Sequence, residues 1–255
     1  MAVATIAGRR LEVGFAGGRG DEIPELVFLH EGLGSVAMWR DFPERVAQAT
    51  GRRALVYSRA GYGESEPIVA PRRVDYMHEE ARVVLPALLA AFGVERPVLL
   101  GHSDGASIAL IHAGEPAARP RGLVLLAPHV MVEPVGLASI ERARHAWEEG
   151  DLRARLARYH ADVDSAFRGW NDVWLHPDFR AWNIEDVLPR VRCPVLAIQG
   201  TDDEYGTMEQ LDRIAAKVPD VERLELPACG HAPHRDRPDE VLAAVTAFVD
   251  RLFRS

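Results

Sequence analysis

The chain has little cysteine, almost no lysine and no long hydrophobic run. Its two cysteines, Cys193 and Cys229, form no CxxC pair and no metal-ligand spacing, so neither a disulfide framework nor a structural zinc site is expected. Only one of the 30 basic residues is a lysine, so a Schiff-base mechanism would depend on Lys217 alone. The longest apolar stretch, residues 83–94, is interrupted by Pro86 and is too short to span a bilayer, which argues against a membrane partner.

The chain also has fewer basic residues than acidic ones, 30 against 38. The net charge is −8 and no basic tail is present, so the chain has little long-range attraction for a phosphate backbone, and nucleic acid is not expected as a partner. The first residues show no basic segment followed by an apolar stretch, so we expect no signal peptide and a cytoplasmic location. With 255 residues, 47% of them hydrophobic, the composition is typical of one globular domain, with or without an insertion. Both a monomer and a homodimer remain open.

Short apolar runs of strand length alternate along the chain with stretches of helical spacing. The expected strands are residues 26–30, 54–58, 97–102, 122–127, 194–199 and 221–226. The expected helices are residues 36–49, 74–92, 106–113, 208–218 and 238–253. Strands that alternate with helices imply parallel strands joined by crossovers, with both faces of the sheet covered. The sequence therefore predicts an α/β fold with a doubly wound, mostly parallel sheet.

One region departs from this alternation. Residues 131–190 contain no convincing strand, but they contain three or four helical stretches with aromatic stripes. Two of these helices are expected to begin at Asp151 and Asp164, since aspartate is a good N-cap residue. We interpret residues 131–190 as a helical cap, or lid, over one end of the sheet, and residues 1–130 and 191–255 as the core.

The motif with the clearest chemistry joins an expected strand to an expected helix. Residues 98–100 lead into Gly101-His102-Ser103-Asp104-Gly105, and a helical stretch follows from Ala106. This is a G-x-S-x-G nucleophile elbow in its usual context, where the glycines leave room for a strained turn that presents the serine hydroxyl. The helix that follows adds amide donors and a positive dipole end near a developing anion. Ser103 is therefore the candidate nucleophile.

A serine hydroxyl needs a base that is held in turn by an acid, and in this kind of fold the chain order is Ser, Asp or Glu, His. An acidic turn, Asp202-Asp203-Glu204, follows the strand at 194–199, at a carboxyl end where open α/β sheets place their active sites. His231 follows the next strand and is therefore the candidate base. A metal ion on His231, His234 and Asp236 is not favoured, because no further ligand nearby completes the set.

These motifs, in this order, resemble the α/β-hydrolase fold superfamily, in its form as a serine hydrolase with a helical cap. The resemblance runs from about residue 10 to the end, and it includes a turn at residues 57–65 that is similar to the family's D-x-R-G-x-G-x-S. It implies an acid at the last place of a G-x-x-D turn, which is Asp203, with Asp202 as the alternative. It also implies an oxyanion hole formed by the backbone amides of Asp104 and Gly32.

Two acidic residues in these motifs leave alternatives open. Glu31 stands where the family usually has glycine, and its carboxylate either turns away to bond the loop or contacts a cationic substrate. Asp104 follows the nucleophile directly. Family members with Ser-Asp-Gly at the elbow include hydrolases of amino-acid esters, so the Asp104 carboxylate could meet a substrate ammonium. Alternatively, it is simply an aspartate favoured at a helix N-terminus.

The resemblance implies hydrolysis through an acyl-enzyme, with no cofactor and no metal ion. The cap is rich in aromatic residues, two or three of which are expected to face the cavity, and this favours a small, partly hydrophobic or aromatic ester as substrate. Candidate substrate-binding residues are Glu31, Trp147, Trp170 and Trp174. The alternatives on the same fold are a C–C bond hydrolase, a lyase, and a cofactor-free oxygenase or haloperoxidase. A non-catalytic receptor for a small ligand is the alternative from a different class.

Overall fold

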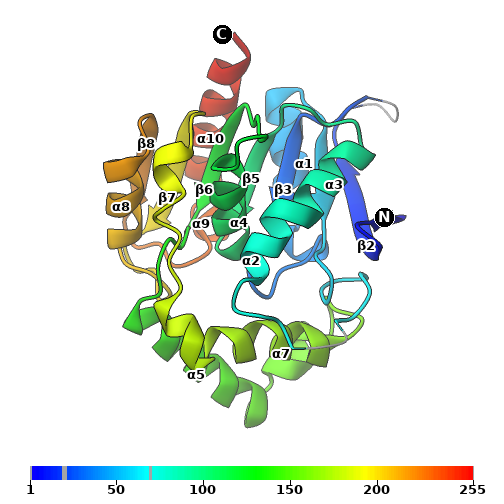
Figure 1. The fold of residues 1–255 in the computed structure, drawn as a ribbon, viewed down its shortest axis with the longest axis vertical. Helices are drawn as coiled ribbons and strands as arrows, with labels where there is room; N and C mark the ends of the chain where they lie inside the picture. The colour runs from blue at the N-terminus through cyan, green and yellow to red at the C-terminus, as the bar shows by residue number, and fades with distance from the viewer. Residues whose placement is uncertain (1, 19–21, 69–70, 255) are drawn as a thin grey trace.

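The computed structural model describes residues 2–18, 22–68 and 71–254. Its centre is an eight-stranded sheet with the order β1-β2-β4-β3-β5-β6-β7-β8, in which β3 to β8 run parallel (Figure 1). The parallel strands are β3 (Leu26–Leu29), β4 (Ala54–Tyr57), β5 (Val98–His102), β6 (Gly122–Leu126), β7 (Val195–Gly200) and β8 (Val221–Leu226). The predicted doubly wound, mostly parallel α/β sheet is therefore confirmed.

An antiparallel hairpin that the sequence analysis did not predict extends the sheet. β1 (Ala2–Ile6) pairs with β2 (Arg9–Ala16), and β2 pairs antiparallel with β4. Ala7 and Gly8 form the connection, with φ angles of 48° and 77°, and two consecutive positive φ angles are typical of a tight hairpin turn. The sequence does not indicate the hairpin, because β1 has only five residues, most of them exposed, and Glu12 interrupts the apolar residues of β2.

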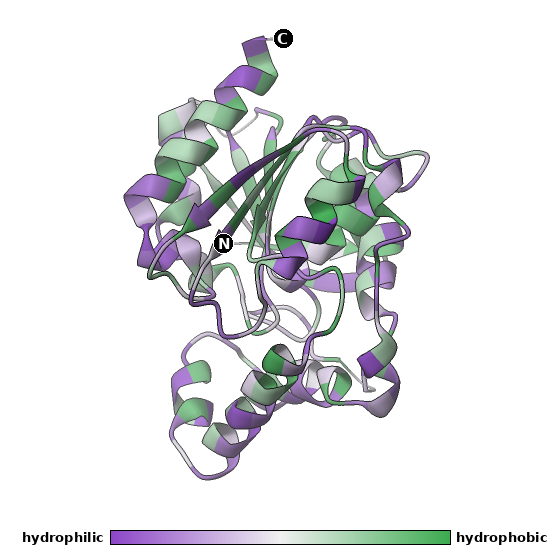
Figure 2. Cartoon of the chain, turned by 90° about the vertical axis from the view of Figure 1, so that its left-hand side faces the viewer, coloured by the Kyte–Doolittle hydropathy of each residue, from purple (hydrophilic) through white to green (hydrophobic). Residues whose placement is uncertain are grey.

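Helices cover both faces of the sheet. α1 (Phe42–Thr50) and α10 (Pro238–Arg254) pack on the face that contains Phe28 and Leu100. The opposite face, with Val27 and Leu99, is covered by α2 (Tyr76–Glu79), α3 (Leu85–Ala91), α4 (Asp104–Ala113) and α8 (Glu209–Lys217). Figure 2 shows the central strands coloured as hydrophobic between these helices. Burying one such side chain stabilises a fold by about 1.5–3 kcal/mol, so the two layers together hold the strands in register.

The segment between β6 and β7 forms α5 (Pro134–Glu148), α6 (Leu152–Leu156) and α7 (Val163–Trp174), which lie together beyond one end of the sheet (Figures 1 and 2). Asp151 precedes α6 as predicted. The predicted start of the next helix at Asp164 is wrong by two residues, because the side chain of Asp162 accepts the hydrogen bond from the Ser165 amide. The boundaries of the cap at residues 131 and 190 stay a prediction.

Because β3 to β8 are parallel, the loops after their carboxyl ends all meet at one edge of the sheet. This edge faces α5 and α7, and the loops after β3, β5, β6, β7 and β8 contribute to one pocket there. Within the described residues, no helix is long and apolar enough to cross a membrane.

Candidate active site

The strained turn after β5 presents Ser103. This residue has φ 53° and ψ −116°, a left-handed conformation that is unfavourable for a residue with a side chain. A Cβ on Gly101 would lie 2.4 Å from the carbonyl oxygen of Gly105, and a Cβ on Gly105 would lie 2.0 Å from the carbonyl oxygen of Leu29. Both positions therefore require glycine, and the close backbone packing that they allow holds Ser103 in the strained conformation.

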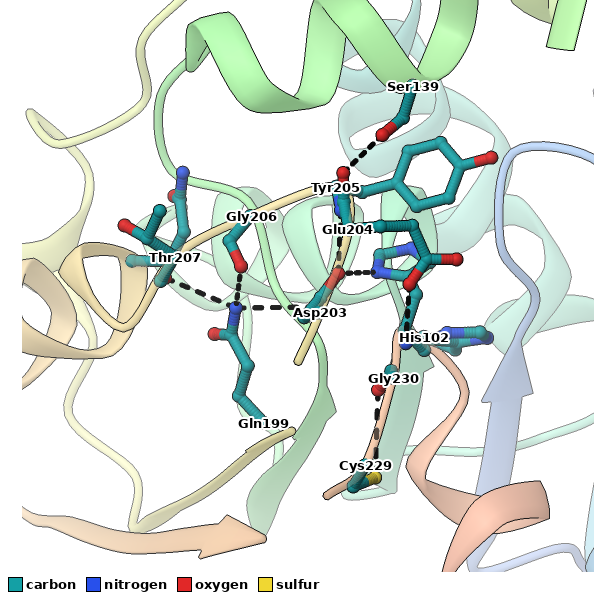
Figure 3. A network of polar contacts seen from close by, with 12 residues as sticks. His102, Ser139, Gln199, Asp203, Glu204, Tyr205, Gly206, Thr207, Cys229 and Gly230 are labelled. Atoms are coloured by element: carbon teal, nitrogen blue, oxygen red, sulfur yellow. Dashed lines mark hydrogen bonds and ion pairs between the residues drawn. The ribbon is translucent and has the colours of Figure 1, made fainter. Parts of the chain in front are cut away.

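The loops after β7 and β8 bring Asp203 and His231 together. Nδ1 of His231 is 2.8 Å from Oδ1 of Asp203, which also accepts a hydrogen bond of 2.9 Å from the amide of Tyr205. Gln199 donates to the other carboxylate oxygen at 3.3 Å, as Figure 3 shows. By contrast, Asp202 is exposed, and its side chain contacts the hydroxyl of Thr201. The structure thus brings Asp203 to His231, and not Asp202.

Each of the two side chains favours the charged form of the other. Burial disfavours a charge on Asp203, but the nearby His231 charge and hydrogen bond outweigh it and keep the Asp203 pKa below its ordinary value. Burial acts to lower the pKa of His231, but the Asp203 carboxylate outweighs this and raises it above the ordinary value. An imidazole in this setting can take up a proton and be stabilised as imidazolium.

Ser103 and His231 line the same pocket, which has a volume of about 100 Å³. In the part of the chain that the structure describes, no hydrogen bond joins them. Such bonds often tighten only when substrate binds. The pocket is smaller than a 150 Å³ cavity that admits benzene, so it suits a small group. The described lining comes from five loops of the core and from α5 and α7: Glu31, Gly32, Leu33, Ser103, His129, Gly136, Ile140, Trp170, Trp174, Tyr205 and His231.

Gly32 lines the pocket together with Ser103, and Asp104 follows Ser103 directly in the chain. The carbonyl of Glu31 accepts hydrogen bonds from Arg59 at 3.0 Å and from the Gly34 amide at 3.1 Å. Since the C=O and N–H of one trans peptide point in opposite directions, these contacts also fix the direction of the Gly32 N–H. The N–H of Asp104 belongs to the first residue of α4, where helices leave amide donors free.

Comparison with known proteins relates this site to a family. The sequence model of the alpha/beta hydrolase family matches residues 26–244. The chain belongs to that family. A sn-1-specific diacylglycerol lipase of Mus musculus is 25% identical, over 89% of this chain and 81% of the relative. An N-formylmaleamate deformylase of Pseudomonas putida is 28% identical, over 92% of this chain and 90% of the relative. Among solved structures, an enol-lactonase from Burkholderia xenovorans has a TM-score of 0.75 at 20% identity and covers 98% of this chain and 100% of its own.

Family membership supports hydrolase activity. The names of these relatives refer to different kinds of bond. The substrate of this alpha/beta hydrolase therefore depends on its own pocket residues.

The Asp104 carboxylate lies away from the pocket. It is fully buried, accepts a 2.5 Å hydrogen bond from the hydroxyl of Tyr76, and lies 3.7 Å from the guanidinium of Arg59. Burial raises the pKa of Asp104, although Arg59 opposes this shift. Asp104 is not among the described residues that line the pocket, so the geometry favours the interpretation in which its carboxylate does not meet a substrate ammonium.

The Glu31 carboxylate folds back over its own loop, where a Cβ on Gly34 would lie 2.3 Å from it. It lies 3.5 Å from Nδ1 of His102 and 3.5 Å from the guanidinium of Arg235. Burial alone would raise the Glu31 pKa, but His102 and Arg235 outweigh burial and hold it well below its ordinary value. Glu31 is therefore an anion that is paired within the protein, although it still forms part of the pocket wall.

The tryptophans of α5 and α7 differ in their surroundings. Trp170 and Trp174 line the pocket, and Trp170 lies so close to Gly32 that a Cβ there would be 2.2 Å from its ring. Trp147, a predicted substrate-binding residue, is not among the described lining residues. Its ring stacks on Phe167 at a centroid distance of 4.1 Å, which places it in the packing between α5 and α7.

His234 is buried against the rings of Trp39 and Phe42. No group of three or more potential ligands that could hold a metal ion occurs within residues 2–18, 22–68 and 71–254.

Two polar pocket residues were not predicted. His129 and Tyr205 follow β6 and β7, and both line the pocket. The rule that led to Asp203, namely that active sites lie at the carboxyl ends of parallel strands, applies equally to these two positions and could have indicated them.

Proposed function

We propose that this alpha/beta hydrolase cleaves small, partly hydrophobic or aromatic esters through an acyl-enzyme on Ser103, with His231 as the base and Asp203 as the acid. The observation that carries the proposal is the hydrogen bond between His231 and Asp203 at the wall of the pocket that also contains Ser103. Because Nδ1 of His231 is engaged by Asp203, Nε2 is the nitrogen available to the serine hydroxyl.

The reaction follows from these positions. The Ser103 oxygen attacks the ester carbonyl while His231 takes its proton, and the oxyanion that forms accepts hydrogen bonds from the amides of Gly32 and Asp104. His231 then returns the proton to the departing alcohol, which leaves an acyl group on the serine oxygen. A water molecule repeats the attack with His231 as base, and this releases the acid and restores Ser103.

The pocket supports a neutral acyl group. Its apolar wall includes Leu33, Ile140 and the rings of Trp170 and Trp174. None of the described lining residues is arginine or lysine, and the Glu31 carboxylate is already paired with His102 and Arg235. A substrate carboxylate would find no arginine or lysine partner in this wall, so neutral esters are favoured over acyl groups that carry a second carboxylate.

The proposal is tested with p-nitrophenyl acetate and butyrate and with a fluorophosphonate that labels reactive serines. We expect turnover of both esters, a burst close to one equivalent of p-nitrophenol if deacylation is slow, and covalent labelling of Ser103. An enzyme that neither hydrolyses these esters nor reacts with the fluorophosphonate would contradict the proposal. Ligand binding without turnover would favour the receptor interpretation.

The pH dependence provides a further prediction. Only neutral His231 can take the serine proton, so kcat/KM should fall as the pH drops through the His231 pKa. Because Asp203 outweighs burial and raises this pKa, the midpoint of the acid limb should lie above 6.5, the ordinary value for histidine. The measurement is kcat/KM for p-nitrophenyl acetate between about pH 5 and pH 9. An acid limb with a midpoint at or below the ordinary value would argue against the charged pair.

A further inference from the structure

His129 is a buried polar residue of the pocket to which the proposed mechanism assigns no step. It follows β6, and its side chain is 4% exposed. Its ring packs edge-to-face against Trp174, with centroids 5.3 Å apart, and lies 5.6 Å from the ring of His231. Since Trp174 and His231 both line the pocket, the imidazole of His129 lies at the pocket wall beside the proposed base.

The ring nitrogens of His129 have no hydrogen-bond partner among the described residues. A hydrogen bond within the protein involves the backbone carbonyl of this residue, which accepts from the hydroxyl of Ser107 at 2.6 Å. The ring nitrogens are not fully enclosed by protein atoms and remain accessible at the pocket wall, so a substrate that covered them without pairing would remove their hydration without compensation. A group that enters the pocket can provide the partner that the protein does not.

The charge state of His129 limits what this partner can be. Burial, together with the positive charge on His231, lowers the His129 pKa to about 3, so the imidazole is neutral near pH 7. A neutral imidazole has one donor and one acceptor nitrogen. It cannot supply the positive charge that a carboxylate would need, and none of the other described lining residues is arginine or lysine. The matching partner is a neutral oxygen, and a hydroxyl can use either nitrogen.

We propose that His129 is a specificity-determining residue that hydrogen-bonds a neutral oxygen substituent, such as a hydroxyl, on the acyl group of the substrate. The proposal rests on the ester hydrolysis proposed above. It narrows the substrate class from small hydrophobic esters to small esters whose acyl group is mainly apolar but carries a hydroxyl. The tryptophans would contact the apolar part of the acyl group, while His129 would form a hydrogen bond with its hydroxyl.

The test compares kcat/KM for p-nitrophenyl butyrate with that for its 2-hydroxy and 3-hydroxy derivatives, each as separate enantiomers. For wild type we expect at least one hydroxy ester to be preferred over butyrate by about 3- to 10-fold, as one neutral hydrogen bond provides. In His129→Leu this ratio should fall to about one, because the side chain is of similar size but forms no hydrogen bond. His129→Gln retains a donor and an acceptor, and should keep part of the preference.

The ratio of kcat/KM for a hydroxy ester to kcat/KM for butyrate distinguishes a hydrogen bond from His129 to the substrate from mere packing of the His129 ring. If His129 only packs against Trp174, both variants will change the rates for all esters in proportion, and the ratio will stay as in wild type. That result would overturn the inference, as would a wild type that prefers butyrate to every hydroxy ester. The wild-type comparison needs no variant, so it remains decisive even if a variant fails to fold. Failure to hydrolyse any ester would instead contradict the proposed function.

Discussion

Replacement of Ser103 by alanine is expected to lower kcat for an aryl ester by about 10⁵-fold or more, because the proposed acyl-enzyme cannot form without the serine oxygen. The fluorophosphonate label should also be lost. Residual hydrolysis above the rate in water would then come from binding and from the oxyanion-hole amides of Gly32 and Asp104 alone. The measurement is steady-state kinetics with p-nitrophenyl acetate, together with mass spectrometry of the labelled protein.

The melting temperature of this variant distinguishes loss of activity from loss of the fold. The Ser103 hydroxyl makes no hydrogen bond within the described residues, so its removal should leave the melting temperature close to that of wild type. The strained backbone is held by the packing at Gly101 and Gly105, which the substitution does not alter. Hydrolysis that survives Ser103→Ala at an undiminished rate would show that another group is the nucleophile.

Replacement of Asp203 by asparagine is expected to lower kcat by about 10⁴-fold, an effect typical of losing the carboxylate that orients a catalytic histidine. An amide that donates to Nδ1 of His231 would favour the tautomer with its proton on Nε2, and this tautomer cannot accept the serine proton. Loss of the carboxylate also removes the interaction that raises the His231 pKa. The acid limb of any residual activity should therefore move to lower pH.

Asp202 provides the matched control for this experiment. It is the neighbouring residue in the same turn, but its carboxylate is exposed and contacts only the Thr201 hydroxyl among the described side chains. Asp202→Asn removes the same charge from the same loop, and kcat should change by less than about 2-fold, as for an ordinary surface substitution. If Asp202→Asn is the inactive variant and Asp203→Asn is not, the acid has been assigned to the wrong residue.

The buried guanidinium of Arg59 links the two residues that would form the oxyanion hole. It donates to the Glu31 carbonyl, which is part of the peptide that contains the Gly32 N–H, and it lies 3.7 Å from the carboxylate of Asp104. Arg59 therefore contacts both residues next to or carrying the N–H groups of the proposed oxyanion hole, and helps to fix their positions. Donors that are positioned before the reaction need no reorganisation when the oxyanion forms, which is the main source of their effect.

Several features of this protein were determined by the sequence alone, since their causes are local. A parallel strand buried on both faces requires a continuous apolar run, and the runs at β3 to β7 were identified in this way. The turn at Ser103 needs glycine on both sides, where the backbone approaches closely, so these five residues between an apolar run and a helical stretch were enough to indicate it. The hairpin β1–β2 lacks such a signal, because β1 is a short and mostly exposed edge strand and Glu12 interrupts the apolar residues of β2.

Other features were decided only by the tertiary structure. Whether Asp202 or Asp203 meets His231, whether Trp147 or Trp170 reaches the pocket, and where the Glu31 carboxylate turns all depend on the direction of a side chain within a loop or helix. Contacts between residues that are distant in the chain set those directions, such as the contact between Asp203 and His231, 28 positions apart, and that between Glu31 and Arg235. Sequence patterns record which residues are near a strand end, but only the packed fold selects which of them face one another.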